Sequence, residues 1–255
     1  MTICILATAA AVALAAAVRS TWSPCGLSML STITPLGERS RGNSYRPTAA
    51  WFVSGAVVGG ATLGAAMALL AGGVHSLHLS ETALGGAALV AAAIAAASDA
   101  GVGGMRLPIH RRQVNERWLD HYRPWVYGAG FGWQIGNGLS TYITTAAVYL
   151  MVVLGALTAD PGAAFALGMA FGTLRGLAVL LTRHLTSPAA LLTFHQRFAA
   201  AGPVVGKVVV AVELAASVAF AVALRSPIAA AVVIGVGTAV AVVAAATRGR
   251  RTLVR

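Results

Sequence analysis

Long apolar stretches recur along the whole sequence, and they limit the fold of this chain more than any other feature. A helix needs roughly 20 mainly apolar residues to cross a bilayer. With 58% apolar residues, 10% charged residues and a mean hydropathy of +0.79, a water-soluble domain of this size would expose large apolar patches. The sequence therefore predicts an all-α, polytopic membrane helix bundle. Its seven predicted spans cover residues 3–34, 49–71, 82–98, 126–157, 162–182, 201–224 and 226–246.

Two of these spans are longer than one crossing requires. Residues 3–34 and 126–157 each form a window of about 32 residues, and both windows contain residues that interrupt helices. Pro24 and Gly26 lie in the first window, and Gly136 and Gly138 lie in the second. Each window therefore predicts a broken or re-entrant helix, a feature that membrane proteins tolerate where it lines a buried site.

The net charge of +11 is explained by membrane topology rather than by nucleic-acid binding. Arginines fill the connections between spans 1 and 2, 3 and 4, and 5 and 6, and the C-terminal tail, whereas the intervening loops are nearly free of them. This alternation predicts a bacterial inner-membrane protein with the N-terminus outside and the C-terminus in the cytoplasm. Residues 1–19 are interpreted as the start of span 1, with a cleavable signal peptide as the alternative.

An internal repeat links the two long windows. The segment Cys25-Gly-Leu-Ser is matched 112 residues later by Asn137-Gly-Leu-Ser, and Gly55 and Gly59 are matched by Gly168 and Gly172 at an offset of 113. An odd number of spans separates the copies, so the second copy is inverted. The predicted organisation is a first three-helix repeat at 1–105, a basic cytoplasmic loop at 106–125, an inverted three-helix repeat at 126–224, and a seventh helix with a basic tail at 225–255.

Polar residues at helical spacing mark the same two windows. In inverted-repeat transporters, discontinuous helices meet near the midplane and hold the substrate there. The alternative is that these hydroxyl and small residues only allow close packing and bond to their own backbone. The predicted substrate-binding residues are Thr21, Cys25, Ser28, Thr32, Gln134, Asn137, Ser140, Thr141 and Thr144.

Four charged residues, Arg19, Arg175, Lys207 and Glu213, fall within or near the ends of predicted spans, where an unpaired charge is costly. Arg175 and Glu213 are predicted to form an ion pair, with a proton relay as the alternative. Arg19 either contacts an anionic solute or extends to the membrane interface. The two histidines His75 and His78 lack a second pair of ligands and are interpreted as solvated loop residues, with a weak surface metal site that includes Glu81 as the alternative. No cofactor is expected.

The segment Ser23-Pro24-Cys25-Gly26, late in the first span and followed by a second three-helix copy, resembles the CcdA/DsbD thiol-redox family of the LysE-like superfamily. The resemblance covers about residues 3–224. It implies electron transfer through two cysteines, one in the first helix of each repeat, and a thioredoxin-like partner. Cys25 matches the first cysteine position, and Asn137 occupies the second. The wider superfamily implies export of amino acids and small ions.

These observations favour a small-solute transporter or exporter that uses the broken helices of spans 1 and 4. One alternative is a redox membrane protein in which Cys25 is catalytic and acts with a partner, and another is a membrane scaffold without turnover. Membrane lipid and an unidentified small solute are the expected partners, and no nucleic acid is expected. The absence of phosphate-binding or hydrolase motifs argues against nucleotide-driven or hydrolytic chemistry.

Overall fold

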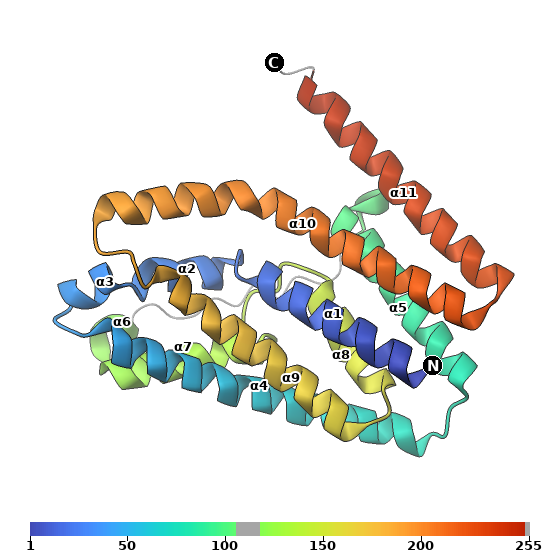
Figure 1. The fold of residues 1–255 in the computed structure, drawn as a ribbon, viewed down its shortest axis with the longest axis horizontal. Helices are drawn as coiled ribbons and strands as arrows, with labels where there is room; N and C mark the ends of the chain where they lie inside the picture. Colours follow the sequence, from blue (N-terminus) through green and yellow to red (C-terminus); the bar gives the residue numbers. More distant parts are fainter. Residues whose placement is uncertain (106–117, 253–255) are drawn as a thin grey trace.

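The computed structural model describes residues 1–105 and 118–252, and all regular elements in this part of the chain are helical. This confirms the predicted all-α bundle (Figure 1). Most of the predicted basic loop at 106–125 lies outside the described residues. The helices are α1 (Thr2–Ser20), α2 (Pro24–Thr32), α3 (Pro35–Ser40), α4 (Tyr45–Ser76), α5 (Glu81–Ala100), α6 (Trp118–His121), α7 (Pro124–Asn137), α8 (Ala147–Leu157), α9 (Pro161–Leu177), α10 (Pro188–Leu224) and α11 (Pro227–Thr252), with short 3-10 turns η1 (Val102–Gly104) and η2 (Ala178–Thr182).

Six helices of the described chain are long and apolar enough to cross a membrane, which supports an integral membrane protein. They are α1, α4, α5, α9 with its η2 extension, α10, and α11 up to Thr247. The predicted span 126–157 is instead divided between α7, which has 14 residues, and α8, which has 11. Neither is long enough to span a bilayer alone.

Helix starts follow a simple sequence signature. Four helices begin with proline directly after a Ser, Thr or Asp whose side chain accepts a hydrogen bond from the first turn. Proline suits the first helical position because its missing N–H would lack a partner there, and the preceding side chain caps the N–H groups that remain. The pairs are Ser23-Pro24, Thr34-Pro35, Asp160-Pro161 and Ser187-Pro188.

The structure places the connections in two groups at opposite ends of the bundle. At one end, the N-terminal amine pairs with Glu81 at 3.3 Å, and the His75 ring lies 3.1 Å from the carbonyl of Ala159. At the other end, the N–H of Leu36 bonds to the carbonyl of Leu185 at 3.1 Å, so the arginine-containing connections that follow predicted spans 1 and 5 lie together. Which end faces the cytoplasm remains a prediction from the charge alternation.

Helix α4 forms the centre of one side of the bundle and packs closely against α7 and α9 (Figure 1). A Cβ atom added at Gly132 or Gly136 of α7 would collide with the backbone of α4, and one added at Gly168 or Gly172 of α9 would do the same. The glycines thus let helix backbones touch. Gly55 and Gly59 of α4 face α7, whereas the matching Gly168 and Gly172 face α4, so the two glycine pairs are not used in equivalent ways.

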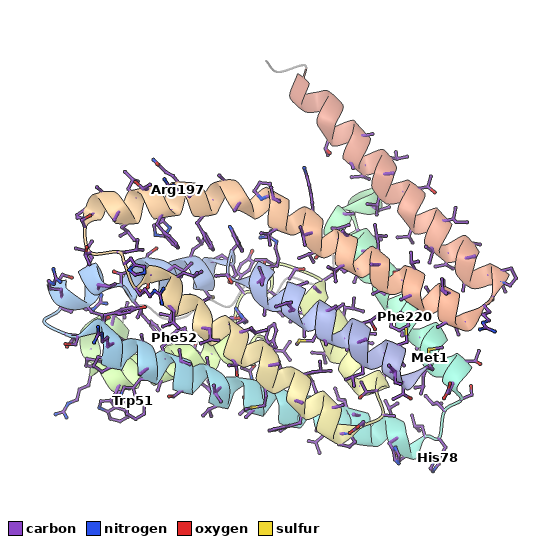
Figure 2. All side chains as sticks on the ribbon, viewed as in Figure 1. Met1, Trp51, Phe52, His78, Arg197 and Phe220 are labelled. Carbon is purple, nitrogen blue, oxygen red and sulfur yellow. The ribbon has the colours of Figure 1, made fainter. Side chains whose placement is uncertain are left out.

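Around this close contact, some large apolar side chains point outward and others are buried in the core, as expected for a helix bundle in lipid. On α4, Trp51 points outward and Phe52 points into the core (Figure 2). The larger core cluster joins α1, α4, α5, α8, α9 and α10, and a second cluster around Cys25, Tyr127 and Phe131 joins α2, α4 and α7. Helix α11 lies obliquely against α5 and α10 and is largely exposed along its length (Figure 1).

Candidate functional site

The first long window contains a break between α1 and α2. Helix α1 ends at Ser20, and α2 starts at Pro24 with Ser23 as its cap, whose hydroxyl accepts from the N–H of Gly26 at 3.2 Å. Cys25 follows directly and is buried. Cys4 lies on α1, and the two cysteines do not form a disulfide with each other.

The second long window contains a wider break, over residues 138–146, between α7 and α8. Gly138 ends α7 with a φ of +73°, a conformation that favours glycine. The side-chain oxygen of Asn137 then accepts from both the N–H of Ser140 at 3.3 Å and its hydroxyl at 3.0 Å. These bonds hold the unwound segment as it leaves the helix.

Arg175 of α9 lies between the two breaks. Its side chain is only 3% exposed, and its guanidinium interacts electrostatically with Cys25 at the first break. On the other side it donates to the hydroxyl of Thr141 at 3.4 Å, next to Gly138 at the second break. Among the described residues, Arg175 forms no ion pair with a carboxylate. A buried positive charge therefore joins the two broken helices.

A second contact between the two halves of the chain occurs at the equivalent positions of the predicted repeat. The amide of Asn137 donates to the hydroxyl of Thr62 on α4 at 3.2 Å. Asn137 follows Cys25 by 112 residues, and Arg175 follows Thr62 by 113 residues. The broken helix of each half thus contacts the second long helix of the other half at matching positions. This pairing supports the inverted repeat, which stays a prediction because the glycine contacts do not follow it.

The remaining predicted site residues do not all meet at one point. The hydroxyls of Thr21, Thr32 and Thr141 donate to backbone carbonyls three or four residues earlier, as the packing alternative expects. Ser28 and Gln134 are half-buried on α2 and α7. The structure thus brings Cys25 and Thr141 to Arg175, joins Asn137 and Ser140 beside them, and leaves the other polar residues in separate surroundings.

Thr144 belongs to a different place, a cavity of about 460 Å³ between α1, α5, α10 and α11. Its hydroxyl is buried and has no hydrogen-bond partner among the described residues. The charged groups that line this cavity, which we call the α10 pocket, are Arg19, Asp99 and Lys207. The rest of the wall is mainly apolar and comes from α10 and α11.

Asp99, at the end of α5, ties this pocket to the second break. Its carboxylate accepts from the hydroxyl of Thr145 and from the N–H of Ala146, the latter at 2.7 Å. Both donors lie just before α8, so Asp99 caps the half-helix that leaves the break. Sequence reasoning missed Asp99 because it falls one residue beyond the predicted span 82–98.

Glu213 of α10 is buried near the α10 pocket, and the ion pair predicted between it and Arg175 is wrong. Glu213 is 0% exposed, and neither of its carboxylate oxygens has a hydrogen-bond partner in the described part of the chain. Counting residues from helix ends gives the depth of a side chain but not the direction in which it points. Glu213 lies on the buried face of α10, a helix that packs mainly against α5 and α1, whereas Arg175 donates to Thr141 at the second break.

A polar cluster at the arginine-rich end of the bundle was not predicted from the sequence. The Glu38 carboxylate accepts from Arg41 at 2.6 Å, from Tyr127 at 2.6 Å and from Thr48 at 3.0 Å. Burial lowers the pKa of Arg41, but the hydrogen bond and the charge of Glu38 outweigh this effect and raise it above its ordinary value. The available signal was that Glu38 is the first acidic residue of the chain, in an otherwise basic loop.

Comparison with known proteins gives one set of relatives. The chain is 32% identical over 160 residues to methylamine utilization protein MauF of Methylorubrum extorquens, covering 62% of this chain and 56% of the relative. The MauF protein of Methylobacillus flagellatus is 34% identical over 154 residues, covering 58% and 53%, and that of Paracoccus versutus is 30% identical over 170 residues, covering 66% and 61%. No family model and no solved structure matches the chain.

These relatives correct the resemblance drawn from Ser23-Pro24-Cys25-Gly26. The curated proteins that match are methylamine utilization proteins MauF, not members of the CcdA/DsbD family. The four-residue segment is explained locally, because Ser23 and Pro24 are the cap and first residue of α2. The chain spans a little over half the length of the curated relatives that it matches, and it is similar to them over that part.

Proposed function

We propose that this chain is an integral membrane transporter that carries a small anionic or zwitterionic solute between its two broken helices. The observation that carries this proposal is Arg175, a buried cation that interacts electrostatically with Cys25 at one break and donates to Thr141 at the other. It has no carboxylate partner among the described residues. An unpaired charge within an apolar span costs several kcal/mol, so such residues usually mark the path of a charged substrate. A small anion at this point would offset that cost.

The surrounding groups suit the same kind of solute. Helix breaks leave backbone N–H and C=O groups that membrane lipid cannot satisfy, and a bound solute can take their place. Cys25, Thr141, Asn137 and Ser140 lie at these breaks and supply small polar side chains. Arg175 is closed off from both ends of the bundle, so the solute reaches it only when the half-helices move apart.

The name of the relatives is the basis for proposing a process that this transport serves. Their shared name is methylamine utilization protein, and we extend that process to this chain as part of the proposal. Methylamine itself is a poor candidate for the solute. An alkylamine carries a positive charge near neutral pH, as the lysine ammonium group does, and Arg175 would repel it.

The test is uptake into proteoliposomes that contain the full chain, with labelled acetate, glycine and methylammonium as the anionic, zwitterionic and cationic probes. We expect uptake of acetate or glycine and none of methylammonium. Arg175→Gln and Asn137→Leu should abolish this uptake, whereas Cys25→Ser should retain it.

The matched control is Arg183→Gln, which removes an exposed arginine at the arginine-rich end and should leave uptake unchanged. Absence of acetate and glycine uptake, or normal uptake by Arg175→Gln, would contradict the proposal. In the host, a chromosomal deletion should slow growth on methylamine, and the Arg175→Gln gene should fail to restore it.

A further inference from the structure

The chain contains two buried glutamates in opposite surroundings. Glu38 and Glu213 are each 0% exposed. Glu38 accepts hydrogen bonds from Arg41, Thr48 and Tyr127, which together stabilise a negative charge. Neither carboxylate oxygen of Glu213 has a partner among the described residues. The Glu38 carboxylate, at one end of the bundle, thus has hydrogen-bond donors for both oxygens, whereas the Glu213 carboxylate, within the bundle, has none among the described residues.

The position of Glu213 makes an ionised carboxylate there very unfavourable. It lies in the apolar part of α10, on the inward face that also carries Val209, Ala216 and Phe220. A negative charge without hydrogen-bond donors or a counter-charge in such surroundings is among the most costly arrangements in a protein. The favourable form of Glu213 in this structure is the neutral acid.

The charged groups around Glu213 come from three helices. Asp99 of α5 is close enough for its negative charge to repel an ionised Glu213, and Arg19 of α1 interacts electrostatically with Asp99. Lys207 lies on α10 itself, six residues before Glu213, or about 9 Å along the helix. Asp99, Arg19 and Lys207 all line the α10 pocket.

The α10 pocket lies beside the buried acid. Val210 and Leu214, which flank Glu213 on α10, line it together with the unpartnered hydroxyl of Thr144. A cavity of about 460 Å³ with three charged side chains on its wall has room for water molecules. Arg19 and Lys207 on the wall of this pocket bring positive charge to the same region of the bundle.

We propose that Glu213 is a proton-binding site within the membrane, which exchanges its proton with water in the α10 pocket. In the exchange, the O–H bond of the neutral acid breaks, the proton passes to water, and the carboxylate keeps the negative charge beside the α10 pocket, which Arg19 and Lys207 line. Combined with the proposed transport, on which this last step rests, proton exchange at Glu213 makes solute movement proton-coupled.

The test is modification of the full chain in vesicles by dicyclohexylcarbodiimide, an apolar reagent that adds to protonated carboxyl groups and leaves a stable N-acylurea. Peptide mass spectrometry then reports each carboxyl group separately as a function of pH. We expect modification of Glu213 at neutral pH and its loss as the pH rises. Glu38, equally buried but hydrogen-bonded, is the internal control and should remain unmodified.

Two variants sharpen this test. In Glu213→Gln the modification at this position should disappear while the pattern at all other carboxyl groups is unchanged. In Asp99→Asn the repulsion on Glu213 is removed, so modification of Glu213 should be lost at a lower pH than in the unsubstituted chain. An unmodified Glu213 in the unsubstituted protein across the whole pH range, or equal modification of Glu38, overturns the proposal.

The outcome is separable from that of the transport proposal because modification needs no solute. Modified Glu213 without acetate or glycine uptake would leave the proton site standing and remove the transporter. Uptake with an unmodified Glu213 would leave the transporter standing and remove the proton site. Uptake that depends on a pH gradient, and that loses this dependence in Glu213→Gln, would support both.

Discussion

The carboxylate of Glu38 receives hydrogen bonds from three different parts of the chain. Arg41 follows α3, Thr48 lies in the first turn of α4, and Tyr127 lies in α7. Hydrogen bonds to a charged group are worth more than those between neutral groups, typically about 1.5–3 kcal/mol. This one side chain therefore fixes how the arginine-rich end of the bundle is assembled.

We expect Tyr127→Phe to lower the free energy of unfolding by about 2 kcal/mol, because it removes the shorter of the two hydrogen bonds that one oxygen of the buried Glu38 carboxylate accepts. Equilibrium unfolding of the purified protein in mixed micelles measures this change. Tyr122→Phe is the matched control, since Tyr122 is exposed, and its effect should stay within about 0.5 kcal/mol. Equal effects of the two substitutions would show that the Glu38 cluster contributes little.

At the level of elements, the helix breaks could be predicted from sequence but the partners of buried charges could not. Pro24, Gly136 and Gly138 are visible as helix interruptions because proline and glycine act on the backbone of their own segment. The neighbours of Arg175 and Glu213 depend on how separate helices rotate against each other. That rotation cannot be predicted from a single sequence.

The bounds of the helices show the same limit. The predicted span 201–224 lies within α10, which begins earlier, at Pro188, and continues past Pro203. Its first turns carry polar residues such as His195 and Arg197, so a hydropathy window excludes them although they are helical. Hydropathy predicts the part of a helix that suits lipid, not the full length of the helix.

The close packing of α7 on α4 leads to a test at this scale. Gly132→Ala should destabilise the protein by about 2 kcal/mol, because the added methyl group collides with the backbone at Phe52. Gly86→Ala on α5 is the control. No atom lies within 4 Å of its added Cβ, so alanine there should stabilise the helix by up to about 1 kcal/mol. Thermal unfolding in detergent compares the two, and equal midpoints would contradict the packing argument.

For the whole molecule, the two groups of connections define a direction across the membrane. Because arginine-rich loops remain in the cytoplasm, we expect the end with the N-terminus to lie outside. In a background of Cys4→Ala and Cys25→Ser, a membrane-impermeant thiol reagent on intact cells should label Leu77→Cys and not Thr186→Cys. Both positions are exposed, and they lie at opposite ends. The reverse labelling would invert the molecule in the membrane.

The two helix breaks share one guanidinium group, and this has a thermodynamic consequence. Arg175 interacts with Cys25 at one break and with Thr141 at the other. Displacing either half-helix leaves the buried charge of Arg175 with fewer partners. The closed position of the other half-helix is then less stable. The free energies of opening the two breaks are therefore linked. A change at one break therefore alters the free energy of opening the other break through Arg175, without a rearrangement of the surrounding helices.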